Sequence, residues 1–105
     1  MPEYQITYWR DLPSLVVTRD DDGGGVMKAP LAPRMQGAID EAAMRLGDVG
    51  SDDYLAGWRR GDWTRAEGNV ADVAATAVAR LESEWSPDAI RAYLDSLGPA
   101  QRVAR

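Results

Sequence analysis

Arginine and tryptophan side chains are interleaved in one short segment, which is the first candidate for chemistry. Residues 58–65 read WRRGDWTR and hold two tryptophans and three arginines. Guanidinium groups bind carboxylates and phosphates through paired hydrogen bonds, and indole rings stack on cations. Both residue types are also enriched among the residues that dominate protein–protein binding. The segment therefore allows three readings: core with solvated charges, a partner surface, or a site for a small anionic ligand.

The opening segment offers a second candidate surface. Residues 4–10 read YQITYWR, and a strand would send Tyr4, Ile6 and Tyr8 to one face, where we expect core. Trp9 falls on the opposite face, so it is the residue most expected to meet a partner. On an edge strand, Arg10 and free backbone groups would add to that surface. The predicted partner-binding residues are Trp9, Arg10, Trp58, Arg60 and Trp63, and the alternative anion-binding residues are Arg59, Arg60 and Arg65.

Carboxylates that could act as acid and base lie close to the same segment. Asp62, Glu67 and Asp72 are the candidates, but paired carboxylates need a deep cleft with a controlled separation. A chain of 105 residues seldom forms such a cleft alone. The acidic run at 20–22 lacks the alternating spacing of a calcium loop and is interpreted as part of a solvated loop. We predict no catalytic residue, metal site or cofactor, and the sequence favours a non-enzymatic role without deciding it.

Composition limits the chemistry further. The chain contains no cysteine and no histidine, which removes the thiolate nucleophile and the commonest general base and metal ligand. A formal net charge of -5 disfavours a general nucleic-acid-binding protein. The start of the chain lacks a basic, then apolar, leader pattern, and no apolar run approaches the roughly 18 residues of a membrane span. These features favour a cytoplasmic protein that binds neither nucleic acid nor membrane.

Three strands are predicted in the first third of the chain, at 4–10, 14–19 and 26–29. β-Branched and aromatic residues favour them. Pro13 cannot donate to a sheet ladder, so it is placed in the connection between the first two strands. In the second strand, Leu15 and Val17 share one face. The three strands should form an antiparallel meander whose inner face needs a cover.

Helices are predicted to supply that cover. Pro33 suits the first turn of a helix, and Gly47 is the predicted end of that helix. Ser51 is expected to cap a short helix and Asn69 a long one. Ser86 followed by proline starts the last helix. The apolar positions at helical spacing are Met35, Ile39, Ala42 and Leu46; Tyr54, Leu55 and Trp58; Val70, Val73, Ala74, Ala77, Leu81 and Trp85; and Ile90, Tyr93, Leu94 and Leu97.

The order of these elements indicates an α+β fold. Strands come first and helices follow, which is typical of a small antiparallel sheet with helices on one face. About three strands are expected, with residues 59–68 ambiguous between a fourth strand and a loop. Three to four helices should cover the sheet. We predict a single domain over residues 1–98, a helix end at Gly98-Pro99 and a flexible tail at 99–105.

One segment also carries a family resemblance. YQITYWRDLP at 4–13 is similar to the opening pattern of a family of small bacterial proteins described as virulence factors. The segment AIDEAAMRLGDVGSDDYLAGWRRG resembles the middle of the same family, and the similarity extends over most of residues 4–95. The resemblance implies no catalytic residues. It implies an accessory subunit, with a one-carbon or corrinoid enzyme as a partner.

Two functional hypotheses follow from these observations. The first is a cytoplasmic interaction module that binds another protein or forms a homodimer. The second is a binder, or accessory enzyme, for a small phosphate- or folate-like anion held by the arginines of segment 58–65. The exposure of the tryptophans in the folded chain tests the first hypothesis, and a thermal-shift screen against such anions tests the second.

Overall fold

A computed structural model describes residues 1–20, 25–47 and 50–97 of the chain. Its elements follow one another as three strands, two helices, two short strands and two helices. The strands are β1 (Pro2–Trp9), β2 (Leu12–Asp20), β3 (Val26–Pro30), β4 (Trp58–Arg60) and β5 (Thr64–Arg65). The helices are α1 (Pro33–Leu46), α2 (Ser51–Ala56), α3 (Val70–Glu84) and α4 (Pro87–Ser96). The α+β prediction is confirmed, and segment 59–68 supplies two short strands to the sheet.

The strands form one antiparallel sheet in the order β3-β2-β1-β4, and β5 also pairs with β1. Strand β1 is therefore central: β2 occupies one side, and β4 and β5 occupy the other. The Gly61 amide continues that side by donating to the Ile6 carbonyl at 2.9 Å. The condition for strand addition along the first strand, an edge position, is not met, because both of its sides are already paired. The sheet's edges are β3 and the β4–β5 segment.

The connection between β1 and β2 is tighter than the sequence predicted. Trp9 and Leu12 face each other in the register, so only Arg10 and Asp11 form the turn. Arg10 adopts a positive φ of 53°, the left-handed conformation that such tight turns use. Pro13 lies inside β2 and not in the connection. The register shifts beside it, and such an irregularity tolerates a residue without an amide hydrogen.

The helices begin and end largely as predicted. Gly47 ends α1 in the left-handed conformation at φ 77°. The Asn69 side chain accepts from the Asp72 amide, and the Ser86 hydroxyl accepts from the Ala89 amide. The short helix departs from the prediction: Gly50, not Ser51, stands at its N-cap position. The expected stop at Gly98-Pro99 and the tail at 99–105 lie outside the described residues.

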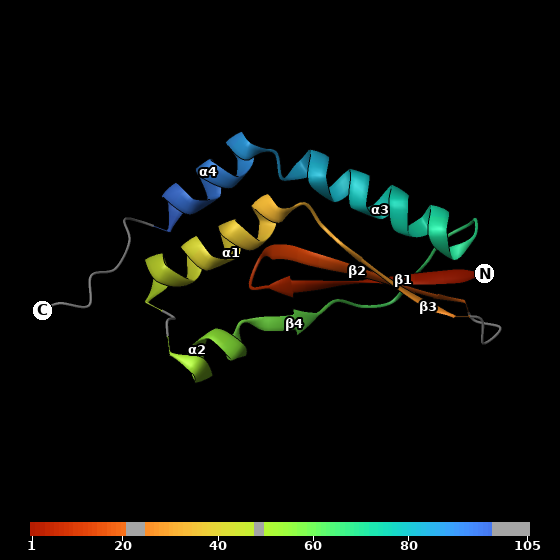
Figure 1. The fold of residues 1–105 in the computed structure, drawn as a ribbon, viewed down its shortest axis with the longest axis horizontal. Coiled ribbons are helices and arrows are strands. Elements are labelled where there is room, and N and C mark those ends of the chain that lie inside the picture. Colours follow the sequence, from red (N-terminus) through yellow and green to blue (C-terminus); the bar gives the residue numbers. More distant parts are fainter. Residues whose placement is uncertain (21–24, 48–49, 98–105) are drawn as a thin grey trace, which may run out of the picture.

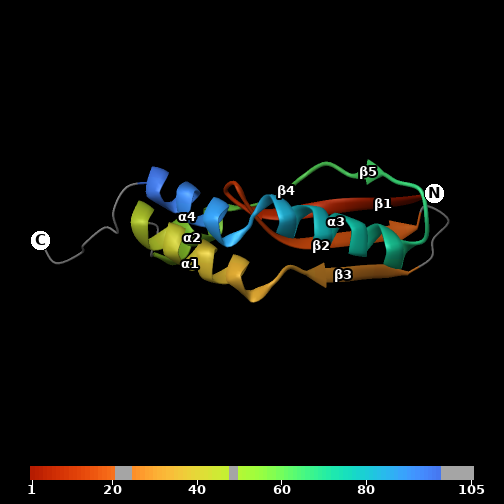
Figure 2. The same cartoon turned by 90° about the horizontal axis from the view of Figure 1, so that it is seen from above.

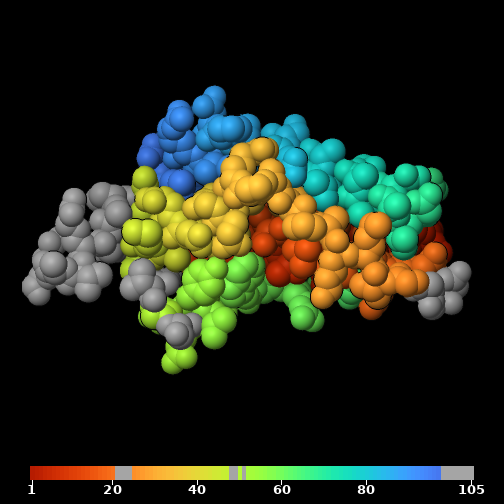
Figure 3. Space-filling view, in the orientation of Figure 1, coloured from red at the N-terminus to blue at the C-terminus, as the bar shows by residue number. Residues whose placement is uncertain are grey.

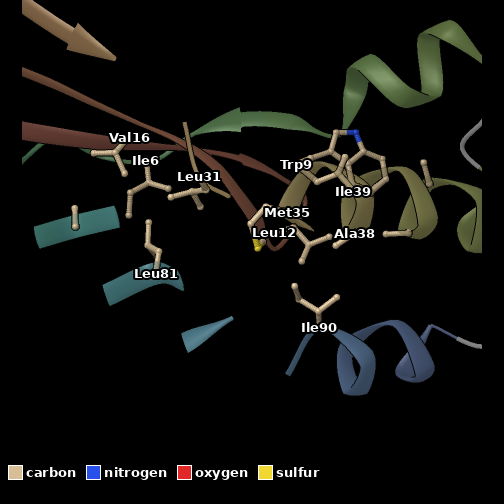
Figure 4. Packing of buried hydrophobic residues seen from close by; sticks show 13 residues of the cluster. Ile6, Trp9, Leu12, Val16, Leu31, Met35, Ala38, Ile39, Leu81 and Ile90 are labelled. Carbon is tan, nitrogen blue, oxygen red and sulfur yellow. The ribbon is translucent and has the colours of Figure 1, made fainter. Parts of the chain in front are cut away.

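One face of the sheet carries the core. Helices α3 and α4 lie on one side of the strands, and α1 lies between them and the sheet's end (Figure 1). Seen from above, α3 runs over β1 and β2 (Figure 2). Ile6 and Val16 lie near Leu81 of α3 in Figure 4, and all three are buried. Tyr4 and Tyr8 are half-buried and pack against this core. The predicted inward face of the first strand is therefore confirmed for Ile6 and partly covered at its two tyrosines.

The helical layer is continuous with the edge of the sheet. In the space-filling view, α1, α3 and α4 lie against one another, and β3 runs along the near side (Figure 3). The start of α1 is tied to the end of α3, because the Ala32 amide donates to Glu82 Oε2 at 2.9 Å. Arg34 adds a donor to the Glu82 carbonyl. These contacts hold the helical layer over one face of the sheet. The layer does not cover the opposite face.

Candidate interaction surface

Trp9 is the main correction to the sequence analysis. Its side chain is fully buried, with 0% of its surface exposed, so it cannot present the exposed surface that was expected of it. The indole Nε1 donates to the Tyr54 carbonyl at 2.7 Å, and its ring stacks on Tyr54 at 5.7 Å between centroids. Figure 4 shows the ring beside Ile39. The short helix α2 returns over this end of β1 and hides a residue that two layers alone would leave exposed.

The backbone around Trp9 is shaped to fit the ring. A Cβ built on Gly57 would lie 2.5 Å from Trp9 Nε1, which is far inside any normal contact. Trp58 is half-buried, lies opposite Trp9 in the register and meets Tyr54 edge-to-face at 5.9 Å. It begins β4 and does not extend the helical stripe, whose Leu55 is 63% exposed. Trp9, Tyr54 and Trp58 thus form an aromatic cluster that stabilises the fold.

Arg10 and Arg59 lie at the hairpin end of the sheet. Both are exposed, and Arg59 Nε donates to the Arg10 carbonyl at 3.0 Å while its Cζ lies 4.3 Å from the Tyr8 ring centre. They line a hollow of about 440 Å³ together with Asp11 and Tyr93. Burial, followed by the neighbouring Asp11 carboxylate that accepts the tyrosine's hydrogen bond, raises the pKa of Tyr93 to about 12. This hydroxyl stays protonated at neutral pH and donates to Asp11.

Arg59 and Arg60 point to opposite sides of the sheet. Side chains alternate along a strand, and the two residues lie opposite Tyr8 and Thr7 respectively. Arg60 therefore shares a side with Thr7, while Arg65 lies opposite Glu3 farther along the same edge. The three arginines of the alternative anion site do not converge on one point.

Arg60 belongs to the sheet face that the helices leave uncovered, which we call the open face. The register places its members in two main rows across neighbouring strands. Each member is half-buried or exposed, in contrast to the buried Val16 and Thr18 that alternate with them on β2. The first row is Pro30, Leu15, Thr7 and Arg60, and the second is Lys28, Val17 and Gln5.

Trp63 closes the open face at the β4–β5 edge. The Arg19 guanidinium stacks on its ring, with Cζ 3.8 Å from the ring centre. The same guanidinium pairs with Glu3 at 3.1 Å, so it is held from two sides. Next to this edge, the side-chain amide of Gln5 donates to the Gly61 carbonyl at 3.0 Å. The segment between β4 and β5 is thereby fixed against β1, and Trp63 keeps a half-buried position beside the strands.

These side chains enclose a shallow trough of about 250 Å³. Among the described residues that line it, three are cationic and none is a carboxylate, although the whole chain carries five more acids than bases. Lys28 and Arg60 are exposed and have no ion-pair partner within the described part of the chain. The trough lining is Gln5, Thr7, Leu15, Val17, Arg19, Val26, Lys28, Arg60 and Trp63.

Sequence reasoning assigned a binding role to two members of this surface and to none of the others. Arg60 and Trp63 were named, and Leu15 with Val17 were correctly placed on a common face. Arg19 has the same alternation as these two on β2, which was the available signal. Lys28 joins them only through the pairing of β3 with β2, which puts it opposite Val17. The register across strands cannot be read from the spacing along one strand.

The three carboxylate candidates are divided between two hollows. Glu67 and Asp72 line a hollow of about 140 Å³, and Asp62 lines a neighbouring one. Asp72 is engaged at the start of α3, where its carboxylate accepts from Asn69 Nδ2 at 3.2 Å. No cluster of three or more metal-binding side chains occurs within residues 1–20, 25–47 and 50–97. In the same ranges, none of the helices has the length and apolar character needed to cross a membrane.

Comparison with known proteins gives one match. Neither the curated proteins nor the solved structures contain a match to this chain. A family model described as "Virulence factor" matches residues 7–93, which includes the hairpin turn, the aromatic cluster and nearly all of the trough lining. The matched range covers well over half of the 105 residues. The chain therefore belongs to the virulence factor family.

Proposed function

We propose that this chain is an accessory module that binds another protein through the open face of its sheet. The observation that carries the proposal is the composition of the trough, where Leu15 and Val17 lie beside the exposed cations Lys28 and Arg60. Binding is favoured when a partner removes half-buried apolar side chains from water, by about 25 cal/mol per Å² of apolar surface buried. Charges at the rim orient the partner and select its sign.

The shape of the trough also favours contact with a partner protein over enclosure of a small ligand. Sites that enclose small ligands usually measure about 300 to 1,000 Å³. The trough measures about 250 Å³ and spreads over four strands and the Trp63 segment. A flat partner surface or segment can cover such a shape. Arg60 and Trp63 keep the partner-binding role predicted for them, whereas Trp9 and Trp58 support the fold.

The wider setting is part of the same proposal. We place the module in the bacterial cytoplasm, with a one-carbon or corrinoid enzyme as the candidate partner and a homodimer as the close variant. Sedimentation at two protein concentrations separates the variants, because self-association depends on the concentration of the chain alone. Cell fractionation followed by immunoblotting tests the location.

Site-specific photo-crosslinking tests the proposal directly. A photoreactive amino acid replaces Val17 on the open face, and the matched control replaces Arg91, whose side chain on α4 is 73% exposed. We expect irradiated bacterial cells to yield a discrete protein adduct from position 17 and none from position 91. An adduct pattern that is the same at both positions, or absent at position 17, would contradict a binding role for the open face.

A second candidate function retains the anion hypothesis at a different place. The hairpin-end hollow of about 440 Å³ holds Arg59, one of the three predicted anion-binding residues, together with Arg10. Two guanidinium groups at one hollow favour a small phosphate- or carboxylate-bearing ligand, whereas the adjacent Asp11 opposes it. A thermal-shift screen against phosphorylated and folate-like compounds, repeated with Arg59→Ala, tests it. No shift in the wild type counts against this candidate.

A further inference from the structure

The uncovered sheet face has a charge opposite to that of the chain as a whole. The chain carries 17 acidic and 12 basic residues, yet the described trough lining contains Arg19, Lys28 and Arg60 without an acid. Arg19 is neutralised by Glu3 at 3.1 Å. Lys28 and Arg60 lie on opposite edge strands, β3 and β4, so one cation stands at each side of the trough.

Between these two cations the trough is apolar. Leu15 and Val17 are two residues apart on β2, which separates their side chains by about 7 Å along the strand. Val17 lies directly opposite Lys28, and Leu15 shares a row with Arg60. An occupant that satisfies this pattern needs apolar side chains against the centre and negative charges at both margins.

We propose that the open face binds an acidic segment of a partner protein in extended conformation, with carboxylates at Lys28 and Arg60 and apolar side chains over Leu15 and Val17. This inference rests on the proposed function and specifies its partner. In an extended chain, alternate side chains point the same way at about 6.6–7 Å intervals, which matches the spacing of Leu15 and Val17. The intervening side chains point away from the sheet, and the long, exposed side chains of Lys28 and Arg60 can reach past the two edges of the segment to meet their carboxylates.

Single-stranded nucleic acid fits this surface less well. Binding of that kind uses several aromatic faces on which successive bases stack. Trp63 is the one aromatic residue in the described lining, and the Arg19 guanidinium already lies 3.8 Å from its ring centre. The central aliphatic side chains of β2 offer contact to apolar side chains and no stacking platform. Charge complementarity with an acidic peptide is therefore the better match.

A defined peptide tests the inference on the full chain. The probe is a fluorescein-labelled peptide of about eight residues with alternating glutamate and leucine, roughly 26 Å long when extended. A second peptide carries glutamine in place of every glutamate, and a third probe is a labelled oligothymidylate. We expect the acidic peptide to bind in fluorescence anisotropy, and binding to weaken at least about fivefold between low and high salt because exposed charges are screened.

Charge-reversed variants locate the binding. Lys28→Glu/Arg60→Glu should lower the affinity for the acidic peptide at least about tenfold. Arg80→Glu/Arg91→Glu makes the same change in net charge on α3 and α4, at two exposed i,i+4 and i,i+3 ion pairs, and should leave the affinity within about twofold. Equal losses in the two double variants would overturn the inference, since the effect would then come from net charge.

The remaining outcomes separate this inference from the proposed function. Equal affinity for the glutamine peptide, absence of acidic-peptide binding, or tighter binding of oligothymidylate each overturns the acidic-segment inference. If the photo-crosslink at position 17 still forms in those cases, the open face binds a protein of different chemistry and the proposed function stands. If the crosslink is absent while the acidic peptide binds at Lys28 and Arg60, the inference about charge stands and the cellular role fails.

Discussion

The two faces of the sheet are built from the same strands but differ in what covers them. On the covered face, Val16 and Thr18 of β2 are fully buried beneath α3. On the open face, Leu15 and Val17 of the same strand remain half-buried beside exposed cations. Alternation along one strand thus divides residues that stabilise the fold from residues that are available to a partner.

Trp9 shows that the division is not set by alternation alone. It shares its alternation with Thr7 of the open face, yet it is fully buried. The difference lies in what covers each position. Helix α2 returns over the hairpin end, where Tyr54 accepts from the indole, and Thr7 lies beyond its reach beside Arg60. Helix α2 thus covers the end of the open face nearest the hairpin and makes this end part of the core.

The largest expected effect is the loss of stability when Trp9 is replaced. Trp9→Ala should lower the free energy of unfolding by about 3–5 kcal/mol, because a fully buried large ring is replaced by a cavity. Trp9→Phe keeps most of the volume, removes the 2.7 Å bond to the Tyr54 carbonyl and should cost about 1 kcal/mol plus the packing change. Urea unfolding followed by circular dichroism measures both. A loss below about 1 kcal/mol for Trp9→Ala would contradict the burial of this residue.

A smaller loss is expected at the glycine beneath the ring. Gly57→Ala should cost about 1–3 kcal/mol, since the added methyl group overlaps Trp9 Nε1. Its φ of -75° is ordinary, so the cost is steric. The control is Gly37→Ala in α1, where a Cβ meets no atom within 4 Å and the helix should gain about 0.5–1 kcal/mol. Opposite signs in thermal unfolding support the close approach of Gly57 to Trp9, and a gain at both positions refutes it.

A matched pair of threonines compares the two faces directly. Thr18 is fully buried, and its hydroxyl has no hydrogen-bond partner among the described residues. Thr18→Val should therefore raise stability by about 1 kcal/mol, because the desolvated hydroxyl is removed with little change of shape. Thr7→Val on the open face should change stability by no more than about 0.5 kcal/mol. Equal effects in urea unfolding would mean that the two faces are not differently covered.

The last expected effect is a pH dependence at the hairpin end, which appears only in alkaline solution. The folded chain holds the Tyr93 proton with a pKa of about 12 against an ordinary value of 10.0, chiefly through burial. The stabilisation is complete below pH 10 and is lost as the pH rises toward 12, because the unfolded chain releases this proton first. Tyr93→Phe should flatten the fall in stability over that window. An unchanged slope in alkaline urea titrations would exclude this contribution.

Much of the fold was predictable because its signals are local. Capping at Asn69 and Ser86, the stop at Gly47 and the stripe from Met35 to Leu46 each follow from short-range geometry, and each is present. The α+β arrangement followed from the order of these segments. Pro13 was misplaced because a register irregularity beside it, which no local pattern reveals, lets it lie within a strand.

The candidate surface was harder to predict because it depends on contacts between distant segments. Burial of Trp9 depends on Tyr54 and Gly57, which lie more than forty residues away in sequence. Lys28 reaches the trough only through its position opposite Val17. The segment at 58–65 was correctly singled out by its residue types. Strand alternation separates Arg59 from Trp58 and Arg60, and the contact of Trp58 with Tyr54 of α2 gives Trp58 different surroundings from Arg60.

One measurement tests the central claim that the open face binds a partner through its cations Lys28 and Arg60 and is not needed for folding. The photo-crosslink at position 17 is compared in the wild-type background and in Lys28→Glu/Arg60→Glu, and the unfolding midpoint of each protein is measured alongside. The account predicts a protein adduct in the wild type that is lost in the double variant. The free energies of unfolding of the two proteins should agree within about 0.5 kcal/mol. An adduct that persists in the double variant, or an adduct lost together with the fold, would contradict it.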